Sequence, residues 1–343
     1  MKIAITMGDA AGIGAEIIVK ALANRALYEQ CIPIVIGDAS AMEDALRFTN
    51  SALKLNLIDA PENALGEYGK IDIVDFKLLK LGDWKYKTVN ALTGGASFMY
   101  VTTAIEYAIQ KRVDAVATGP INKEAINLAG HHYAGHTEIF AHYTNTADYA
   151  MLLSCRSLRV IHVTTHVSME DACRLIKTER VLKVIKLADY GARLLGVEKP
   201  CVGVAGFNAH SSENGLFGAQ EAEAIIPAIE LARNENINVE GPVPPDTVFV
   251  KALSGKYDIV VAMYHDQGHI PLKLCGFKMD PKTGIYSSMS GINCTLGLPF
   301  IRSSVDHGTA FGKAGDGRAN EESMVEAIEA AYIMTQNMRK IET

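Results

Sequence analysis

The stretch "KIAITMGDAAGIGAEIIVKALANRALYEQ" (Lys2–Gln30) begins as a short apolar run, passes through a glycine-rich turn and continues with amphipathic periodicity. The apolar run is typical of a buried strand, and the periodicity after it is typical of a helix. The same order of strand, polar turn and helix recurs along the chain. This alternation predicts an α/β fold, with α/β/α layers around a largely parallel sheet.

The pattern predicts nine strands and five long helices. The strands are expected at 2–7, 32–38, 55–59, 113–119, 150–154, 158–165, 201–207, 257–264 and 293–298. The helices are expected at 16–30, 97–112, 178–196, 220–235 and 321–340. No repeat, low-complexity tract or Pro/Gly-rich linker interrupts this alternation. We therefore expect any two lobes to be tightly joined, with the chain crossing between them more than once.

Composition limits the classes of function. The 343 residues are 48% hydrophobic and 21% charged, as in ordinary globular proteins. A net charge of −6 argues against a nucleic-acid or anionic membrane surface, but it permits a small anionic substrate. No apolar run reaches the roughly 18 residues of a membrane helix, and the first one is too short for a signal peptide. Six scattered cysteines without a Cys-x-x-Cys pair predict a reduced, cytoplasmic protein.

Polar residues follow the predicted strands, where ligands bind in open α/β sheets. His166, His210 and His265 each lie at or just beyond a strand end. If these strands share a sheet, three imidazoles can meet at one edge, and three histidines with an open position form a catalytic metal site. His162 is a weaker candidate, because it lies about 13 Å before His166 on the same strand. Surface or core histidines remain the alternative for each one.

Other motifs suit an anion. "GDAAGIGAEI" is either an anion-binding loop or a structural turn, since it is not a Gly-x-Gly-x-x-Gly fingerprint. In "GHTEIFA", Thr137 either caps a helix whose first turn holds Glu138, or donates with His136 to an anionic substrate. Lys273, Asn293 and Arg302 suit a phosphate or carboxylate, or lie on a solvated face. Residues 278–290 are expected to form a loop.

Several motifs, read in order, resemble the 4-hydroxythreonine-4-phosphate dehydrogenase family. They are "TGPINKEA", "GHTEIFA", "HVTTHV", "GFNAHSSENG", "PPDTVF", "YHDQGH", "LGLPFIRSSVDHGTAF" and "AGDGRAN". "VDHGTAFGKAGDGRAN" is also similar to the adenine-ribose loop of isocitrate and isopropylmalate dehydrogenases. The chain departs from the family where Ala10 or Ala11, and Ala15, replace prolines, which predicts a looser first turn. "MGDAAGIGAEIIVKA" and "HDQGHIPLKL" look closer to the branch acting on D-threonate or D-erythronate 4-phosphate.

This resemblance implies an isocitrate/isopropylmalate dehydrogenase-like fold of two lobes and a homodimer with shared active sites. Residues 1–125 and 285–343 would form the cofactor-side lobe, and 126–284 the metal, substrate and dimerisation lobe. His166 and His210 match metal ligands from one subunit, and His265 matches the ligand from the other. The substrate-binding positions are matched by His136, Thr137, Lys273, Asn293 and Arg302. The cofactor positions are matched by Asp306, His307, Gly308, Thr309, Ala310 and Asn320.

The implied reaction is oxidation of the 3-hydroxyl of a 4-phosphorylated C4 hydroxy acid, followed by decarboxylation. The substrate would be 4-hydroxythreonine 4-phosphate, as in pyridoxine biosynthesis, or D-threonate or D-erythronate 4-phosphate, in carbohydrate metabolism. The cofactors would be NAD or NADP and a divalent metal, zinc first, with magnesium, manganese or cobalt as alternatives. Asp246 and Asp266 are candidates for orienting a histidine or moving a proton. A phosphotransacylase-like transferase and a non-catalytic phosphometabolite-binding protein remain as alternatives.

Overall fold

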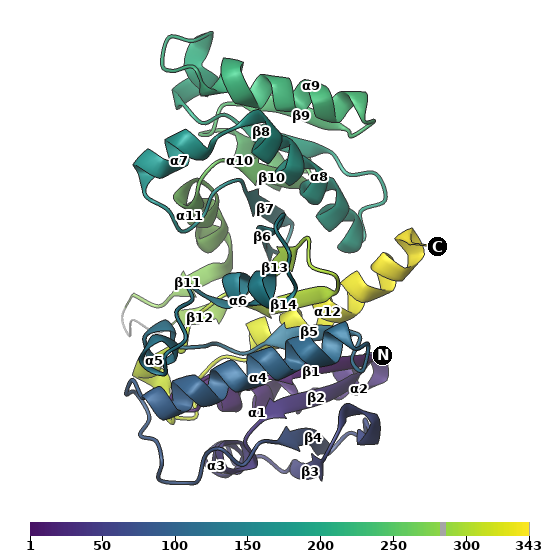
Figure 1. Ribbon diagram of the computed structural model, residues 1–343, viewed down its shortest axis with the longest axis vertical. Helices are drawn as coiled ribbons and strands as arrows, with labels where there is room; N and C mark the ends of the chain where they lie inside the picture. Colours follow the sequence, from purple (N-terminus) through teal and green to yellow (C-terminus); the bar gives the residue numbers. More distant parts are fainter. Residues whose placement is uncertain (282–285, 343) are drawn as a thin grey trace. The chain divides into compact units, whose positions relative to one another are not determined.

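The structure, a computed structural model, describes residues 1–281 and 286–342 (Figure 1). The chain forms two compact units, which we call the first unit (Met1–Ala147 with Leu298–Gln336) and the second unit (Asp148–Gly297 with Asn337–Thr343). The lobe boundaries expected from the sequence, at 125/126 and 284/285, stay predictions, and the second of them lies outside the described residues. Helices α5 and α6 fall in the first unit because helix α4 packs against both of them.

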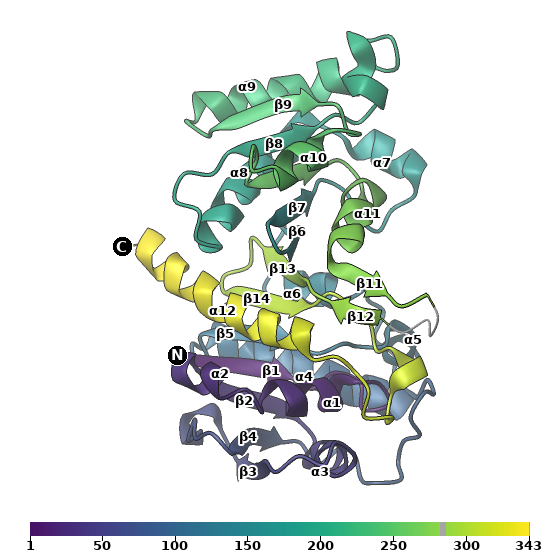
Figure 2. The same ribbon diagram turned by 180° about the vertical axis from the view of Figure 1, so that it is seen from behind.

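The first unit is built on a parallel sheet with strand order β3-β4-β2-β1-β5-β14. Its strands are β1 (Lys2–Thr6), β2 (Ile32–Gly37), β3 (Lys54–Ile58), β4 (Lys70–Asp75), β5 (Ala115–Thr118) and β14 (Ile301–Val305). Its helices are α1 (Gly14–Ala21), α2 (Arg25–Gln30), α3 (Ala39–Phe48), α4 (Ala91–Ile109), α5 (Lys123–Leu128), α6 (His136–Tyr143) and most of α12 (Glu322–Ile341). Helix α4 covers one face of this sheet, and α1 and α12 cover the other (Figures 1 and 2).

The second unit has the strand order β13-β6-β7-β10-β8-β9. Strands β7, β10, β8 and β9 run parallel, whereas β6 runs antiparallel to both of its neighbours. The strands are β6 (Ala150–Cys155), β7 (Leu158–His162), β8 (Val202–Ala205), β9 (Val239–Val243), β10 (Ile259–Ala262) and β13 (Ile292–Leu296). Helices α8 (Thr178–Leu194), α10 (Val248–Leu253) and α11 (His265–Gly276) pack on this sheet, and α9 (Ile226–Asn234) packs on α8 and β9. Helix α7 spans Met169–Leu175, and β11 (Phe277–Met279) pairs with β12 (Tyr286–Met289).

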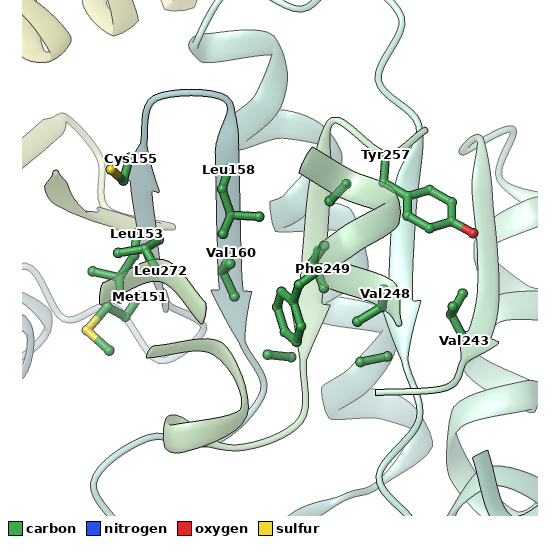
Figure 3. Close-up of a cluster of buried hydrophobic side chains, with 14 residues drawn as sticks. Met151, Leu153, Cys155, Leu158, Val160, Val243, Val248, Phe249, Tyr257 and Leu272 are labelled. Atoms are coloured by element: carbon green, nitrogen blue, oxygen red, sulfur yellow. The ribbon is translucent and has the colours of Figure 1, made fainter. Parts of the chain in front are cut away.

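A hydrophobic cluster fixes the site-bearing helices on this second sheet (Figure 3). Alternate side chains of β6 and β7, such as Leu153 and Val160, point to one face because side chains alternate along a strand. Phe249 of α10 and Leu272 of α11 pack into the same cluster, and Leu272 is fully buried. Burial of one such side chain stabilises the fold by roughly 1.5–3 kcal/mol. The start of α11, which carries His265, is thereby held against β7.

The α/β fold class and all nine expected strands are confirmed. Three further strands were missed for reasons visible in their sequences: β4 carries charges, β9 contains Gly-Pro, and β14 ("IRSSV") is polar although it is buried. The expectation of a loop at 278–290 was wrong at its ends, because β11 and β12 pair there around residues 282–285, which lie outside the described ranges. None of the helices in the described ranges combines the length and the apolar character that a bilayer crossing requires.

Two of the five expected helices were wrong in detail. The helix expected at 16–30 is broken, because the Asn24 side chain accepts from the backbone N–H of Ala26 and starts α2 anew. The helix expected at 220–235 opens with a π-helical turn, Glu221–Ile225, before α9. Pro227 lies in the first turn of α9, directly after this π-helical turn, and it has no N–H to donate to a carbonyl of the preceding turn.

The buried His162 predicts an acid sensitivity of the second unit. Burial, with a smaller effect of the neighbouring His269, lowers the pKa of His162 to about 3. Between pH 6.5 and 3 the unfolded chain therefore binds a proton that the folded chain lacks, so stability falls as the pH falls. His162→Asn removes the titrating ring and keeps a donor for the carbonyl of Met151. Urea unfolding between pH 6.5 and 4 should show the wild type losing about 1.4 kcal/mol per pH unit more than the variant. Parallel losses would contradict this assignment.

Candidate functional site

Three neighbouring parallel strands position the candidate site in the second unit. Strand β10 lies between β7 and β8 and is parallel to both. Their carboxyl ends therefore open on the same edge of the sheet. The loop after β7 carries His166, the loop after β8 carries His210, and His265 follows β10 by three residues. The sequence-based expectation that these strands share one edge is thus confirmed, while the ligand role of each histidine stays a prediction.

His166 and His265 face one cavity. Their ring centroids lie 5.8 Å apart in the same chain. Both line a cavity of about 300 Å³, together with Thr165, Tyr264 and Asp266. Nδ1 of His265 lies 2.6 Å from Oδ1 of Asp266. Because a carboxylate only accepts, Nδ1 carries the proton and Nε2 is left as the nitrogen that can bind a metal ion.

His210 is presented by a left-handed turn. Five consecutive residues have positive φ: His210 (50°), Ser211 (54°), Ser212 (64°), Glu213 (41°) and Asn214 (58°). Residues other than glycine, asparagine and aspartate rarely adopt this left-handed conformation, which costs them roughly 1–2 kcal/mol each. Such strain persists only where the surrounding structure fixes it, and it concentrates at functional sites.

Two side chains hold the backbone at the start of this turn. The buried carboxylate of Glu221 accepts from the backbone N–H groups of Phe207 (2.8 Å) and Asn208 (2.7 Å). Gln267 on α11 donates to the carbonyl of Gly206 at 2.8 Å and accepts from the N–H of Met263 at 2.6 Å. Gln267 therefore ties the loop after β8 to the loop after β10. These contacts join the His210 and His265 segments into one supported edge.

The donor chemistry of this edge fits a divalent metal in part. Imidazole nitrogens suit zinc and related ions, and the Asp266 contact with His265 is the outer-shell arrangement usual for metal-bound histidine. Within 1–281 and 286–342, however, no three His, Cys, Asp or Glu side chains lie close enough together to hold an ion. The ring of His210 lies beside that of Phe217, with centroids 6.4 Å apart. His166 and His265 are thus brought together, and His210 is placed on the neighbouring loop.

Sequence reasoning missed the contact between His269 and the other histidines. It treated His265 as the end of a strand, whereas the structure starts helix α11 at His265. Residues four apart on a helix lie on the same face, so His265 and His269 stack, with ring centroids 3.7 Å apart. Burial and then the neighbouring His265 lower the pKa of His269 to about 4, so its ring is neutral near pH 7. The spacing of "HDQGH" would have given this contact had the helix been recognised.

The remaining predicted residues of the second unit lie on different elements. Lys273 lies on α11, with its ammonium 4.2 Å from the ring centroid of Phe277, and Asn293 lies in β13. Asp246 is exposed and lines a groove of about 550 Å³ between α10 and α11. That groove is mostly apolar, and its wall includes Val250 and Leu274.

The first unit holds a second group of predicted residues. Arg302 on β14 is 2% exposed, and its guanidinium donates to the hydroxyl of Thr118 at 2.8 Å. Nε2 of His136 on α6 is buried and has no hydrogen-bond partner within the described residues. Burial, followed by the charges of Arg302 and Lys123, holds the pKa of His136 well below its usual value. A neutral imidazole beside a buried guanidinium can donate to an anionic ligand.

The helix-capping interpretation of Thr137 was wrong. Helix α6 begins at His136, its N-cap is Gly135, and no side chain caps it. Thr137 is therefore the second residue of the helix, and it is 9% exposed. Glu138 does lie in the first turn, as expected.

The predicted cofactor loop is packed against the glycine-rich first loop of the same unit. The N–H of Ile13 donates to the carbonyl of Thr309 at 3.1 Å. A Cβ on Gly12 would lie 2.8 Å from Cβ of Thr309, so this approach requires glycine. Ala310 adopts a left-handed conformation (φ 44°), and Oδ1 of Asn320 accepts from the N–H of Glu322 at the start of α12. The loop that follows β14 is thus held in place before any ligand binds.

The first turn itself is held by the side chain of the buried Asp9. Its partner is Ala11, which is one of the positions where the chain differs from the family's prolines. Oδ1 of Asp9 accepts from the N–H of Ala11 at 2.8 Å, a bond that proline cannot make. Burial raises the pKa of Asp9. Lys20 on α1 donates to the carbonyls of Gly317 (2.9 Å) and Ala319 (2.7 Å). These bonds fix the segment before Asn320 to the first helix.

The chain is similar to known proteins over nearly its whole length. The family described as pyridoxal phosphate biosynthetic protein PdxA matches residues 29–331. D-threonate 4-phosphate dehydrogenase from Cupriavidus necator is 46% identical over 327 residues, covering 95% of each chain. The crystal structure of 4-hydroxythreonine-4-phosphate dehydrogenase from Klebsiella pneumoniae is 44% identical, covers 98% of each chain and superposes with a TM-score of 0.84.

A more distant similarity bears on the transferase alternative. A phosphotransacetylase from Staphylococcus aureus is 13% identical, with a TM-score of 0.52, and covers 96% of this chain and 94% of its own. At this identity the likeness shows a shared fold alone. The much closer relatives are dehydrogenases, which favours the oxidoreductase interpretation over the transferase.

Proposed function

The chain belongs to the family of the pyridoxal phosphate biosynthetic protein PdxA and is an oxidoreductase, and we propose that it oxidises the 3-hydroxyl group of a 4-phosphorylated C4 hydroxy acid. The observation that carries the proposal is the edge of the second sheet. There His166 and His265 share a cavity, and Asp266 leaves Nε2 of His265 available to a metal ion. A metal ion bound there would act as a Lewis acid on the substrate hydroxyl and favour its oxidation.

The proposed substrate is D-threonate or D-erythronate 4-phosphate. The relative named for D-threonate 4-phosphate is 46% identical to this chain, and the motif "HDQGHIPLKL" favours the same branch. 4-Hydroxythreonine 4-phosphate is the second candidate, because the 44% identical Klebsiella structure is named for it. A comparison of kcat/KM for the three compounds, with NAD and with NADP, separates these substrates and identifies the cofactor.

His166, His210 and His265 would hold a divalent metal ion, for which we propose zinc. When bound, the metal would draw electron density from the substrate hydroxyl, and NAD or NADP would accept the hydride. The three imidazoles are neutral ligands, so they leave the charge of the ion undiminished. Asp266 would keep the proton of His265 on Nδ1 by accepting a hydrogen bond from it.

Several polar residues are proposed to bind the charged groups of the substrate. Arg302 offers a planar pair of donors and His136 a neutral imidazole, both suited to a phosphate or carboxylate. Thr137 of the same unit, and Lys273 and Asn293 of the second unit, are the other proposed substrate-binding residues. Anchoring both ends determines which carbon faces the nicotinamide. Oxidation at C3 gives a 3-keto acid, whose keto group lies β to the carboxylate, and such acids lose CO₂ readily.

The loop after β14 is proposed to bind the adenosine of the cofactor. The residues are Asp306, His307, Gly308, Thr309, Ala310 and Asn320. Support comes from its rigid attachment to the first loop through Thr309 and Gly12. A loop that is fixed before binding loses little conformational freedom when the cofactor arrives.

A homodimer whose active sites are completed by both subunits is the proposed assembly. The second unit exposes large apolar side chains beside the candidate site: Leu274 is 78% exposed, Val250 64% and Ile270 58%. Together with Phe249 and Leu253 they line the groove between α10 and α11. Exposed apolar surface of this kind is typical of protein interfaces. Tyr264 and Asp266 line both this groove and the histidine cavity, so an interface there would adjoin the site.

Removal of His210 tests the metal assignment. His210→Ala should lower metal-dependent NADH formation, followed at 340 nm, by at least about 100-fold, since even outer-shell substitutions cost 10–100-fold. His210→Asn should lose as much, although asparagine accepts the left-handed backbone readily. His132→Ala, at an exposed histidine of the first unit, is the matched control and should retain the wild-type rate. Full activity of His210→Ala would remove His210 from the metal site.

Subunit complementation tests the sharing of sites. His166→Ala and His265→Ala chains carrying different affinity tags are co-expressed, and the mixed dimer is purified. If His265 of the partner subunit serves each site, one site per mixed dimer is intact, and about half of the wild-type activity returns. If His166 and His265 of one chain serve the same ion, as their 5.8 Å separation within a chain also permits, the mixed dimer stays inactive and the shared-site proposal fails.

A further inference from the structure

His269 has no part in the proposed metal, substrate or cofactor sites, yet its ring packs against that of the proposed metal ligand His265. Its ring lies parallel to that of His265, with centroids 3.7 Å apart and an interplanar angle of 12°. Its Nδ1 lies 3.0 Å from the backbone carbonyl oxygen of His265. Because a carbonyl only accepts, Nδ1 of His269 carries a proton and donates it to that oxygen. The ring is therefore fixed by its own hydrogen bond as well as by the stack.

His269 also lies beside a residue of the sheet. The ring of the fully buried His162 on β7 lies 4.7 Å away, centroid to centroid. Nδ1 of His162 is itself 3.3 Å from the carbonyl oxygen of Met151. Helix α11 can approach His162 this closely because residue 268 is glycine: a Cβ there would lie 2.4 Å from Nε2 of His162. The ring of His269 is thus in contact with a buried strand residue as well as with His265.

His269 is badly oriented to be a metal ligand beside His265. The lone pair of an imidazole nitrogen lies in the plane of its ring, and a zinc–nitrogen bond is about 2.0–2.1 Å long. Two parallel rings 3.7 Å apart direct their lone pairs side by side rather than toward one ion. The geometry therefore separates the two histidines into one residue that can coordinate and one that supports it.

We propose that His269 is a positioning residue, whose ring holds the imidazole of His265 in the plane required for metal binding. The inference rests on the proposed function of His265 as a ligand. His265 is 38% exposed and begins a helix, so its ring would otherwise sample several rotamers. Asp266 fixes the edge of the ring through Nδ1, and His269 fixes its face. Together they fix the direction in which the lone pair on Nε2 of His265 points.

Two substitutions separate the stack from the hydrogen bond. His269→Phe keeps a flat ring against His265 and removes the donor, whereas His269→Asn keeps a donor and removes the ring. The dissociation constant for Co²⁺ is measured by competition with a chromogenic chelator, and the visible spectrum of the bound Co²⁺ is recorded. We expect His269→Phe to bind within about threefold of the wild type with the same spectrum. His269→Asn should bind about tenfold more weakly, with an altered spectrum, as for other outer-shell changes.

The same titration on His210→Ala distinguishes a failure of this inference from a failure of the proposed function. If His210→Ala binds Co²⁺ as the wild type does, the proposed metal site is wrong. If His210→Ala loses the ion while His269→Asn binds it unchanged, only the positioning role is overturned. Equal losses in the Phe and Asn variants would also overturn it, since the stack would then not be the cause. Thermal unfolding of the metal-free proteins should give similar midpoints, and affinity kept by His269→Phe excludes a general loss of stability.

Discussion

The adjacency of β7, β10 and β8 is the constraint on which the candidate site depends. These three strands run parallel in one sheet, so their carboxyl ends place the segments of His166, His265 and His210 on the same edge. The hydrophobic cluster beneath α10 and α11 fixes this edge, and Gln267 links two of its loops. A site assembled from segments that are spread over about a hundred residues thereby needs no metal-binding motif of close spacing.

Burial and local hydrogen bonds determine the chemical state of the histidines. His162 and His269 remain neutral because burial lowers their pKa values to about 3 and 4. Asp266 instead keeps a proton on Nδ1 of the more exposed His265. Two uncharged rings, those of His162 and His269, therefore lie near the residues that are proposed to bind a doubly charged ion. Charged imidazoles there would repel such an ion, so the neutrality of these two rings is compatible with the proposed metal site.

The sequence predicted the sheet well because its strands are apolar runs whose ends are polar. It missed β14, whose Arg302, Ser303 and Ser304 are buried although they are polar, since periodicity cannot report burial by tertiary contacts. The strand-end argument selected His166, His210 and His265, but it placed His265 at the end of a strand rather than at the start of α11. The left-handed turn at His210 depends on backbone geometry that the sequence pattern does not encode. The stack of His265 with His269 follows from their i,i+4 spacing, but only once α11 is recognised as a helix.

The central claim is that His166, His210 and His265 bind one divalent ion. Anomalous diffraction at the zinc absorption edge, from crystals of the wild-type protein grown with zinc, tests it most directly. The account predicts one strong anomalous peak per site, about 2.0–2.1 Å from an imidazole nitrogen of each of the three residues. A peak bound by other side chains, or its absence from these histidines at saturating zinc, would contradict the account.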